Sequence, residues 1–423
     1  MVANGRGAED ALLIAAVAAA PPVPELVAGA AGAPFEVMLG IFLLFVGAKV
    51  GEEVARRLGQ PAVIGELAGG FIVGPGALAL VAPGETAFVL AEIGVVILLF
   101  SVGLGVRLDD LLAVGRPAVL TALIAMVLPI LAGVGIGLLL GESPGTAAFV
   151  GLALAATSIG ITSRVLADMG VLSRTFARVV LGAAVIDDVL ALILIGIVSG
   201  AAEGDISGST ILIAVAAVGL VGLGFAAARR ARGLKREVFT FPLFADTPLV
   251  PAFMLMFAVA LVSAAIGLAA IVGAFVAGLI VAETEAQDEL EHEMRPLGQI
   301  FTPFFFAVTG AQLDLSALLD PSIAALALVL ALAGVATKVV GGYVGAHSLG
   351  RWSATTVGFG MVPRGEVGIV VANLGLAAGL LSSSLFSAIL IAVVATTIVA
   401  PYLLAWSIPR AEAEARALGV AAR

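Results

Sequence analysis

The sequence predicts an all-α polytopic membrane protein, and its composition and apolar periodicity support this fold class. Of the 423 residues, 61% are hydrophobic and 12% are charged, which is far more apolar than a soluble domain of this size. Apolar stretches of about 20 residues recur along the chain, each long enough for a helix to cross hydrocarbon of ~30 Å. Membrane barrel strands would instead alternate over about ten residues.

We expect about 13 transmembrane helices, of which the ninth and tenth are short. They follow an extracytoplasmic N-terminal segment, residues 1–33, whose apolar run is too short to span a membrane and stops at Pro21. Residues 409–423 are expected to form a short cytoplasmic tail. The expected spans lie near 35–57, 61–81, 86–106, 117–140, 146–169, 174–200, 208–228, 249–266, 268–282, 297–313, 321–347, 352–378 and 383–408.

The basic residues give this order of spans an orientation. Lysine and arginine collect in cytoplasmic loops, so alternate loops should differ in basic charge. With these spans, one side receives Arg6 alone, and the other receives nearly all remaining loop arginines. This predicts a multi-pass protein of the cell (inner) membrane with its N-terminus outside and its C-terminus in the cytoplasm. The expected cytoplasmic loops carry Arg56, Arg57, Arg107, Arg116, Arg174, Arg178, Arg229, Arg230, Arg232, Lys235, Arg236, Arg295 and Arg351.

The span order also divides the chain into two halves. Residues 34–200 hold spans one to six, residues 201–248 hold a linker span and a basic cytoplasmic loop, and residues 249–408 hold spans eight to thirteen. Because the linker is a single span, the second half enters the membrane upside down relative to the first. We therefore expect two inverted six-helix repeats, an arrangement typical of secondary transporters.

One span in each half carries residues that break a helix. The fifth span contains Ala156-Thr-Ser-Ile-Gly-Ile-Thr162, and the twelfth contains Val362-Pro-Arg-Gly-Glu-Val-Gly368. Irregular backbone at this depth is tolerated where it packs against protein or lines a cavity. Two such breaks that cross would form crossed unwound helices with a binding site between them.

Asp187 and Asp188 lie halfway along the sixth span, far from other charges in the sequence. An ionisable group at the bilayer centre costs at least about 2.5–3.5 kcal/mol, so a functional role is the first hypothesis and a structural hydrogen bond or ion pair is the alternative. Adjacent helical residues point about 100° apart, so the two carboxylates should have different roles. We expect Asp188 to face the broken fifth helix.

A carboxylate in this position can bind a proton or a metal ion. Burial favours its protonated form and a nearby cation favours its ionised form, so the two compete for one site. Hard cations prefer oxygen ligands, which the hydroxyls and freed carbonyls around Thr157, Ser158 and Thr162 offer. We therefore assign Asp188 and Thr157 as ligands of Na⁺ or K⁺, with Asp188 as the proton carrier.

Three further charges lie at mid-span depth. Lys338, in the eleventh span, is too deep to reach the interface and is expected to pair with Asp187, for transport or as a purely structural ion pair. Arg364 and Glu366 could belong to the site or could compensate the helix ends at the break. Arg164 is expected to compensate the helix ends at the first break.

Other charges are given structural roles. Glu66, Glu92 and Lys49 lie near or inside the first three spans, and we interpret them as more often structural than functional. The acidic run 283–293, which includes His292, is expected to be solvated rather than a pH sensor.

Composition excludes several kinds of chemistry. The chain has no cysteine and two histidines, so thiol catalysis, iron–sulfur clusters and cysteine zinc sites are excluded, and no cofactor is expected. A net charge of −9 argues against nucleic acid as a partner. The lipid bilayer is the expected surrounding.

These residues together resemble the second family of monovalent cation/proton antiporters, and within it the sodium/proton antiporters with an aspartate pair. The resemblance covers nearly the whole chain from about residue 35. It is carried by Gly59-Gln-Pro-Ala-Val-Ile-Gly-Glu-Leu-Ala-Gly-Gly, Ala156-Thr-Ser-Ile-Gly-Ile-Thr-Ser-Arg-Val-Leu, Asp187-Asp188, Phe301-Thr-Pro-Phe-Phe-Phe-Ala-Val-Thr-Gly, Lys338 and Pro363-Arg-Gly-Glu-Val-Gly.

The resemblance implies a homodimeric secondary transporter, not an enzyme, that exchanges Na⁺, K⁺ or Li⁺ for H⁺ in pH and sodium homeostasis. A core of crossed helices would move as an elevator against a dimerisation domain. The positions matching Asp188 and Thr157 would bind the ion, that matching Asp187 would pair with that matching Lys338, and Glu366 matches a glutamate of the second crossing. An aspartate pair with a lysine resembles the electrogenic branch, whereas potassium-efflux relatives carry a glutamine before the essential aspartate.

Several alternatives remain open on the sequence. A K⁺/H⁺ antiporter would use the same ligands, and a cation channel could use the same carboxylate without proton coupling. An intramembrane aspartyl protease would need aspartates on two facing helices, whereas Asp187 and Asp188 are neighbours. An organic-anion symporter would have less need for a buried lysine and aspartates.

Overall fold

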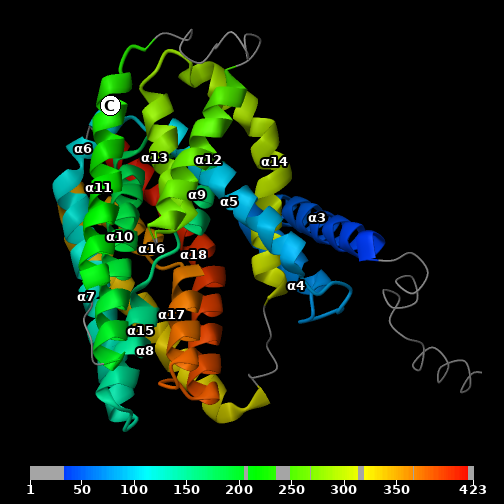
Figure 1. The fold of residues 1–423 in the computed structure, drawn as a ribbon, viewed down its shortest axis with the longest axis vertical. Helices are drawn as coiled ribbons and strands as arrows, with labels where there is room; N and C mark the ends of the chain where they lie inside the picture. Colours follow the sequence, from blue (N-terminus) through cyan, green and yellow to red (C-terminus); the bar gives the residue numbers. More distant parts are fainter. Residues whose placement is uncertain are drawn as a thin grey trace, which may run out of the picture.

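The computed structural model describes residues 33–203, 208–234, 248–266, 268–312, 319–364 and 366–417, and every regular element in these ranges is helical (Figure 1). Six stretches of this part are long and apolar enough to cross a membrane. The helices are α3 (Ala33–Arg57), α4 (Ala62–Val73), α5 (Glu85–Leu104), α6 (Leu108–Ala113), α7 (Gly115–Leu139), α8 (Pro144–Ala155), α9 (Ile159–Asp168), α10 (Thr175–Glu203), α11 (Gly208–Ala231), α12 (Leu249–Ala265), α13 (Ala270–Ala282), α14 (Gln287–Ala311), α15 (Pro321–Gly345), the 3-10 turn η3 (His347–Leu349), α16 (Arg351–Gly360), α17 (Glu366–Ala377) and α18 (Ser383–Ala417).

The helix ends agree with most expected spans and differ at the second, tenth and thirteenth. α4 ends at Val73, eight residues before the expected end of the second span at 81, because the amides of Leu80 and Val81 return to the Val73 carbonyl in a turn. α13 is short, with 13 residues, as expected of the ninth span. α14 has 25 residues and begins at Gln287, ten residues before the expected start of the tenth span at 297.

The extra length of α14 comes from the acidic run that we expected to be a solvated loop. Its first turn contains Asp288 and Glu289, which suits the positive end of the helix dipole. At the other end of the chain α18 continues to Ala417, so part of the expected tail is helical. The N-terminal segment 1–33 lies outside the described residues except for Ala33.

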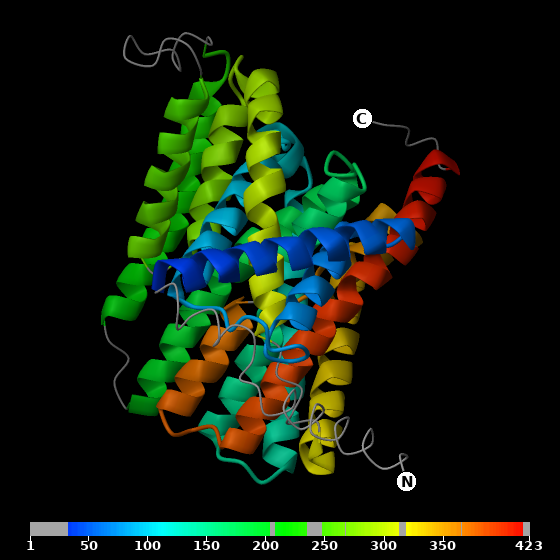
Figure 2. The ribbon, with the colours of Figure 1, turned by 90° about the vertical axis from the view of Figure 1, so that its right-hand side faces the viewer.

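The helices form two groups, and each group packs mainly on its own members. α3, α4, α5, α12, α13 and α14 pack on one another and form what we call the scaffold group. α7, α8, α9, α10, α15, α16, α17 and α18 form the broken-helix group, and α11 lies against both α13 and α10. Figure 2 shows α3 running across α4 and α14 on the outside of the scaffold group, while α18 runs obliquely through the broken-helix group.

Glycine lets the scaffold helices meet at backbone contact. A Cβ atom added at Gly65 of α4 would lie 2.0 Å from the carbonyl oxygen of Gly51 in α3, and one at Gly310 of α14 would lie 2.0 Å from that of Leu67. Helices in hydrocarbon associate through such close packing, since lipid offers no hydrophobic driving force between them. The scaffold group is therefore tightly matched in shape.

Helix α15 begins with a polar cap. The Asp320 carboxylate accepts hydrogen bonds from the amides of Ser322 and Ile323, at 2.8 and 3.4 Å. These bonds favour the ionised form and hold the pKa of Asp320 below its usual value. This exposed cap lies at the start of the helix that carries Lys338.

Candidate functional site

Two helices of the broken-helix group are interrupted at the same place. α8 ends at Ala155 and α9 begins at Ile159, while α16 ends at Gly360 and α17 begins at Glu366. The backbone amide of Ser158 donates to the carbonyl of Pro363 at 2.8 Å, so the two breaks touch. Pro363 has no amide hydrogen and disfavours a helical residue before it, which accounts for the second break. The expected crossing of unwound segments is present.

Arg364 occupies the crossing and is fully buried. Its Nε and Nη2 donate to the carbonyl of Leu154 at 2.9 and 2.7 Å, and Nη2 also donates to the carbonyl of Gly334 at 3.0 Å. The last carbonyls of α8 thus receive a positive charge at the negative end of the helix. Of the two roles that the sequence left open for Arg364, these contacts favour charge compensation at the break.

Lys338 reaches the same crossing from α15. Its Nζ donates to Thr157 Oγ1 at 2.6 Å and lies 3.5 Å from Asp187 Oδ2. Lys338 and Asp187 are both fully buried, and Asp187 Oδ1 has no hydrogen-bond partner among the described residues. The expected pairing of Lys338 with Asp187 is therefore present, and Thr157 joins it, a contact that the sequence did not predict.

Asp188 is the next residue of α10 and is 6% exposed. Nearby in the first break, the Ser158 hydroxyl is buried and has no hydrogen-bond partner among the described residues. Thr162 is tied elsewhere, because its hydroxyl donates to the Gly360 carbonyl at the end of α16, at 2.7 Å. Carboxylate and hydroxyl oxygens dominate this place, which suits a hard cation rather than a soft one.

Two other expected site residues need comment. The backbone of Glu366 begins α17, but its side chain lies outside the described part of the structure. Arg164 does not compensate the first break. It pairs instead with Glu66 on α4 at 3.3 Å and with Asp168 one turn along α9 at 3.2 Å, because its position on α9 faces the scaffold group.

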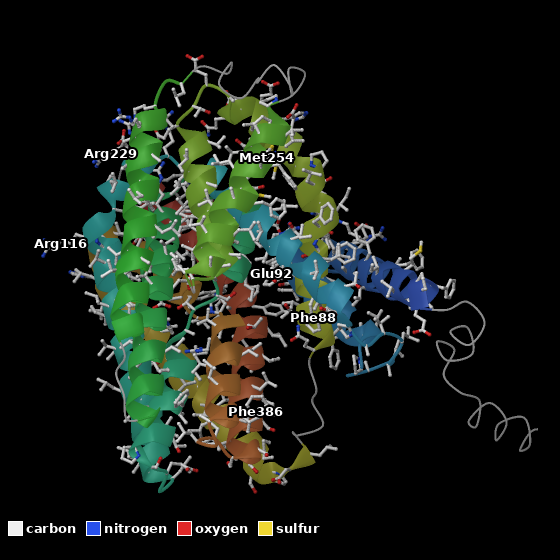
Figure 3. The ribbon with its side chains drawn as sticks, viewed as in Figure 1. Phe88, Glu92, Arg116, Arg229, Met254 and Phe386 are labelled. Carbon is white, nitrogen blue, oxygen red and sulfur yellow. The ribbon has the colours of Figure 1, made fainter. Side chains whose placement is uncertain are left out.

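A cavity of about 560 Å³ lies between the two helix groups and reaches the crossing. Ser158 and Arg364 line the end of the cavity at the crossing. On α5 it is lined by Phe88, Ala91, Glu92 and Val95, whose spacing places them on one helix face. Figure 3 shows Phe88 and Glu92 on α5 across from Phe386 on α18.

The cavity changes the interpretation of one residue. Glu92 is exposed. From the sequence, its charge was expected to be structural more often than functional. Among the described residues that line this cavity, Glu92 is the one carboxylate. The helical spacing from Phe88 to Val95 could have suggested a shared face, but nothing in the sequence says that this face meets a cavity.

The sequence matches the family described as sodium/hydrogen exchanger, transmembrane, over residues 40–408. The chain therefore belongs to the sodium/hydrogen exchanger family. It is a multi-pass membrane protein and a secondary transporter, not an enzyme.

Individual relatives agree over nearly their whole length. The chain is 34% identical over 414 residues to the high-affinity Na⁺/H⁺ antiporter NhaS3 of Synechocystis sp., covering 86% of this chain and 88% of that protein. It is 32% identical over 377 residues to the Na⁺/H⁺-K⁺ antiporter GerN of Bacillus cereus, covering 88% and 96%. The structure of the sodium/proton antiporter MjNhaP1 from Methanocaldococcus jannaschii has a similar fold, with a TM-score of 0.64, 17% identity and coverage of 89% and 98%.

Proposed function

We propose that this chain exchanges Na⁺ for H⁺ across the cytoplasmic membrane, with Asp188 as the shared site for the cation and the proton. The observation that carries this proposal is the buried cluster of Lys338, Thr157 and Asp187 at the crossing, next to Asp188 on α10. Competition between a proton and a cation for one carboxylate is sufficient to couple their fluxes in opposite directions. The family and the named relatives support the class of substrate.

Lys338 and Asp187 supply the second part of the mechanism. Removing one partner of a buried ion pair leaves an uncompensated charge, so the pair holds together while the site is empty. A cation that binds at Asp188 adds positive charge beside Lys338. Because like charges repel, it disfavours the protonated form of Lys338. Release of that proton, in addition to the one from Asp188, would make exchange electrogenic.

Access to the site would alternate by movement of one helix group against the other. The broken-helix group contains the crossing, and the cavity lies at its boundary with the scaffold group. In this proposal the broken-helix group moves as an elevator, and the scaffold group forms the interface of a homodimer. The inverted repeats 34–200 and 249–408, and the outside position of the N-terminus, belong to the same proposal.

K⁺ is the second candidate cation. The relative from Bacillus cereus is described as a Na⁺/H⁺-K⁺ antiporter, and the oxygen ligands at the crossing do not by themselves select between the two ions.

The first test is exchange in everted membrane vesicles with a preset pH gradient. We expect Na⁺ to collapse the gradient and Asp188→Asn to reduce this activity at least about a hundredfold, because the amide cannot release a proton. Li⁺ and K⁺ are compared at several pH values. Asp320→Asn is the matched control, since asparagine also caps a helix and Asp320 lies away from the crossing. Full exchange by Asp188→Asn would contradict the assignment.

A further inference from the structure

Glu66 is a buried carboxylate that the proposed transport chemistry does not use. It lies on α4 and is fully buried. Its Oε1 accepts a hydrogen bond from Arg164 Nη2 at 3.3 Å, and its Oε2 has no hydrogen-bond partner among the described residues. It belongs to the Gly-Gln-Pro motif that the sequence analysis singled out and that the cation site leaves unexplained.

The Glu66–Arg164 pair joins the two helix groups. α4 packs on α3 and α14 in the scaffold group, whereas α9 belongs to the broken-helix group. By contrast, the ion pair Arg174–Glu412, at 3.0 Å, connects two residues of the broken-helix group. Movement of one group against the other would therefore separate Glu66 from Arg164, and the ion pair opposes that movement.

The pair lies directly beyond the floor of the cavity. Leu67, next to Glu66, and Ile161, one turn before Arg164, both line that cavity. Apart from residues at the crossing and Ile369 on α17, the rest of the lining comes from the first half of α5, the start of α13, the last turns of α14 and the first half of α18. These segments lie on the extracytoplasmic side in the expected topology. α4 begins and α9 ends at the opposite side, close to Arg56 and Arg174. The crossing thus communicates with the cavity, and the pair closes the other side.

Separation of the pair would not leave both charges without a partner. Arg164 also pairs with Asp168 on its own helix at 3.2 Å, so it keeps a partner when α9 moves away from α4. Glu66 would be left to water and to the charges of α3, among which Lys49 and Glu52 are close enough to act on it. A buried carboxylate that loses its partner is strongly destabilised unless water reaches it. Opening of this side to water therefore goes together with breaking the pair.

We propose that Glu66 and Arg164 form the seal that closes the cation site on the cytoplasmic side, and that this contact breaks in every transport cycle. The proposal rests on the alternating access proposed above. It predicts that a covalent link between the two positions stops exchange, although neither residue contacts the cation.

The absence of cysteine from the chain makes a disulfide test direct. In Glu66→Cys/Arg164→Cys we expect a short bifunctional methanethiosulfonate, which joins two thiols through disulfides and replaces the length of the two lost side chains, to lower Na⁺/H⁺ exchange in vesicles at least about tenfold, with recovery in reductant. The matched control is Arg174→Cys/Glu412→Cys, a pair within the broken-helix group, in which the cross-link should leave exchange unchanged. Exchange that continues in the cross-linked Glu66→Cys/Arg164→Cys protein would overturn the proposal. Failure of this variant to cross-link where the control does would also overturn it.

A second measurement does not depend on transport. Glu66→Met/Arg164→Met removes both charges and leaves none buried without a partner. If the pair stabilises the state with the open cavity, a cysteine at Leu390, which lines the cavity, should react at least about twofold more slowly with an impermeant maleimide in this background. An unchanged rate would overturn the proposal. Loss of exchange by the unaltered chain would contradict the antiport function instead, so the two failures are distinguishable.

Discussion

Two neighbouring aspartates have different surroundings although their side chains start one residue apart. Asp187 faces α15, where Lys338 lies 3.5 Å away, and is fully buried, whereas Asp188 is 6% exposed. The rotation of about 100° per residue in a helix is enough to separate the two environments. The different surroundings of the two carboxylates follow from helical geometry and from the position of one lysine.

Glu92 allows a residue-scale prediction about recruitment of the cation. It is exposed on the cavity face of α5, so its charge should raise the local cation concentration near the crossing. We expect Glu92→Gln to raise the half-saturating Na⁺ concentration for the side that the cavity faces by about two- to fivefold at low ionic strength, and less at high salt. The maximal rate should be unchanged. Exchange in proteoliposomes of defined orientation measures both quantities.

The control for this variant is Glu85→Gln, at the exposed start of the same helix and outside the cavity. It should leave the half-saturating concentration unchanged. An equal effect of the two substitutions would show that Glu92 acts through general surface charge and not through the cavity.

At the scale of the element, the helix breaks and the helix contacts have separate causes. Pro363 and the residues around Thr157 interrupt two helices, and Arg364 then satisfies the carbonyls that the break at α8 leaves free. In the scaffold group the helices are continuous where they touch, and glycine decides how closely they approach. One group is thus built around irregular backbone and the other around regular, tightly packed helices.

Gly65 tests the packing of the scaffold group. Alanine there would place a Cβ atom 2.0 Å from the backbone oxygen of Gly51, so α3 and α4 must separate. We expect Gly65→Ala to lower stability by about 1–3 kcal/mol, because overpacking cannot be relieved by a side-chain rotation. Thermal unfolding of the purified protein in detergent measures this as a lower Tm.

Gly135→Ala in α7 is the matched comparison, since nothing lies within 4 Å of an added Cβ atom there. Alanine favours a helix over glycine, so its Tm should be equal or higher. A lower Tm for Gly135→Ala than for Gly65→Ala would contradict the packing argument.

For the molecule as a whole, the cavity described above lies on one side of the crossing. The cavity is bounded by α5 and α14 on one wall and by α18 on the other, and it ends at the crossing and at Leu67 and Ile161. A transporter with a single central site needs a second arrangement in which the opposite side opens. The arrangement described here is therefore one of the states that the proposed cycle requires.

Cysteine labelling tests which side the cavity faces. In Leu390→Cys we expect an impermeant maleimide to react in right-side-out vesicles and much less in everted ones, because the thiol reacts as the thiolate and only in water. Arg229→Cys, in the basic last turn of α11, should show the reverse. Ala388→Cys, fully buried on the same helix as Leu390, should be unreactive from both sides. Labelling of Leu390→Cys from the cytoplasmic side would invert the proposed topology.

Local patterns in the amino-acid sequence predict the membrane-spanning fold class, the places of the two broken helices and the mid-span charges. These features depend on local properties: an apolar stretch of sufficient length crosses lipid, proline interrupts a helix, and a charge at that depth needs a partner. The pairing of Lys338 with Asp187 was accessible to the same reasoning, since few buried charges of opposite sign were available.

The contacts between distant segments could not be predicted in this way, because they depend on how the helices pack. Thr157 accepts a hydrogen bond from Lys338, and Arg164 pairs with Glu66 across the two groups, although the partners are far apart in the chain. Glu92 faces a cavity, although its sequence context resembles that of the other charges that we interpreted as structural. The position of a charge within an apolar stretch indicates how deep it lies in the membrane, but not which helix it faces. That choice depends on how the helices rotate and approach in packing, which sums contacts from the whole molecule.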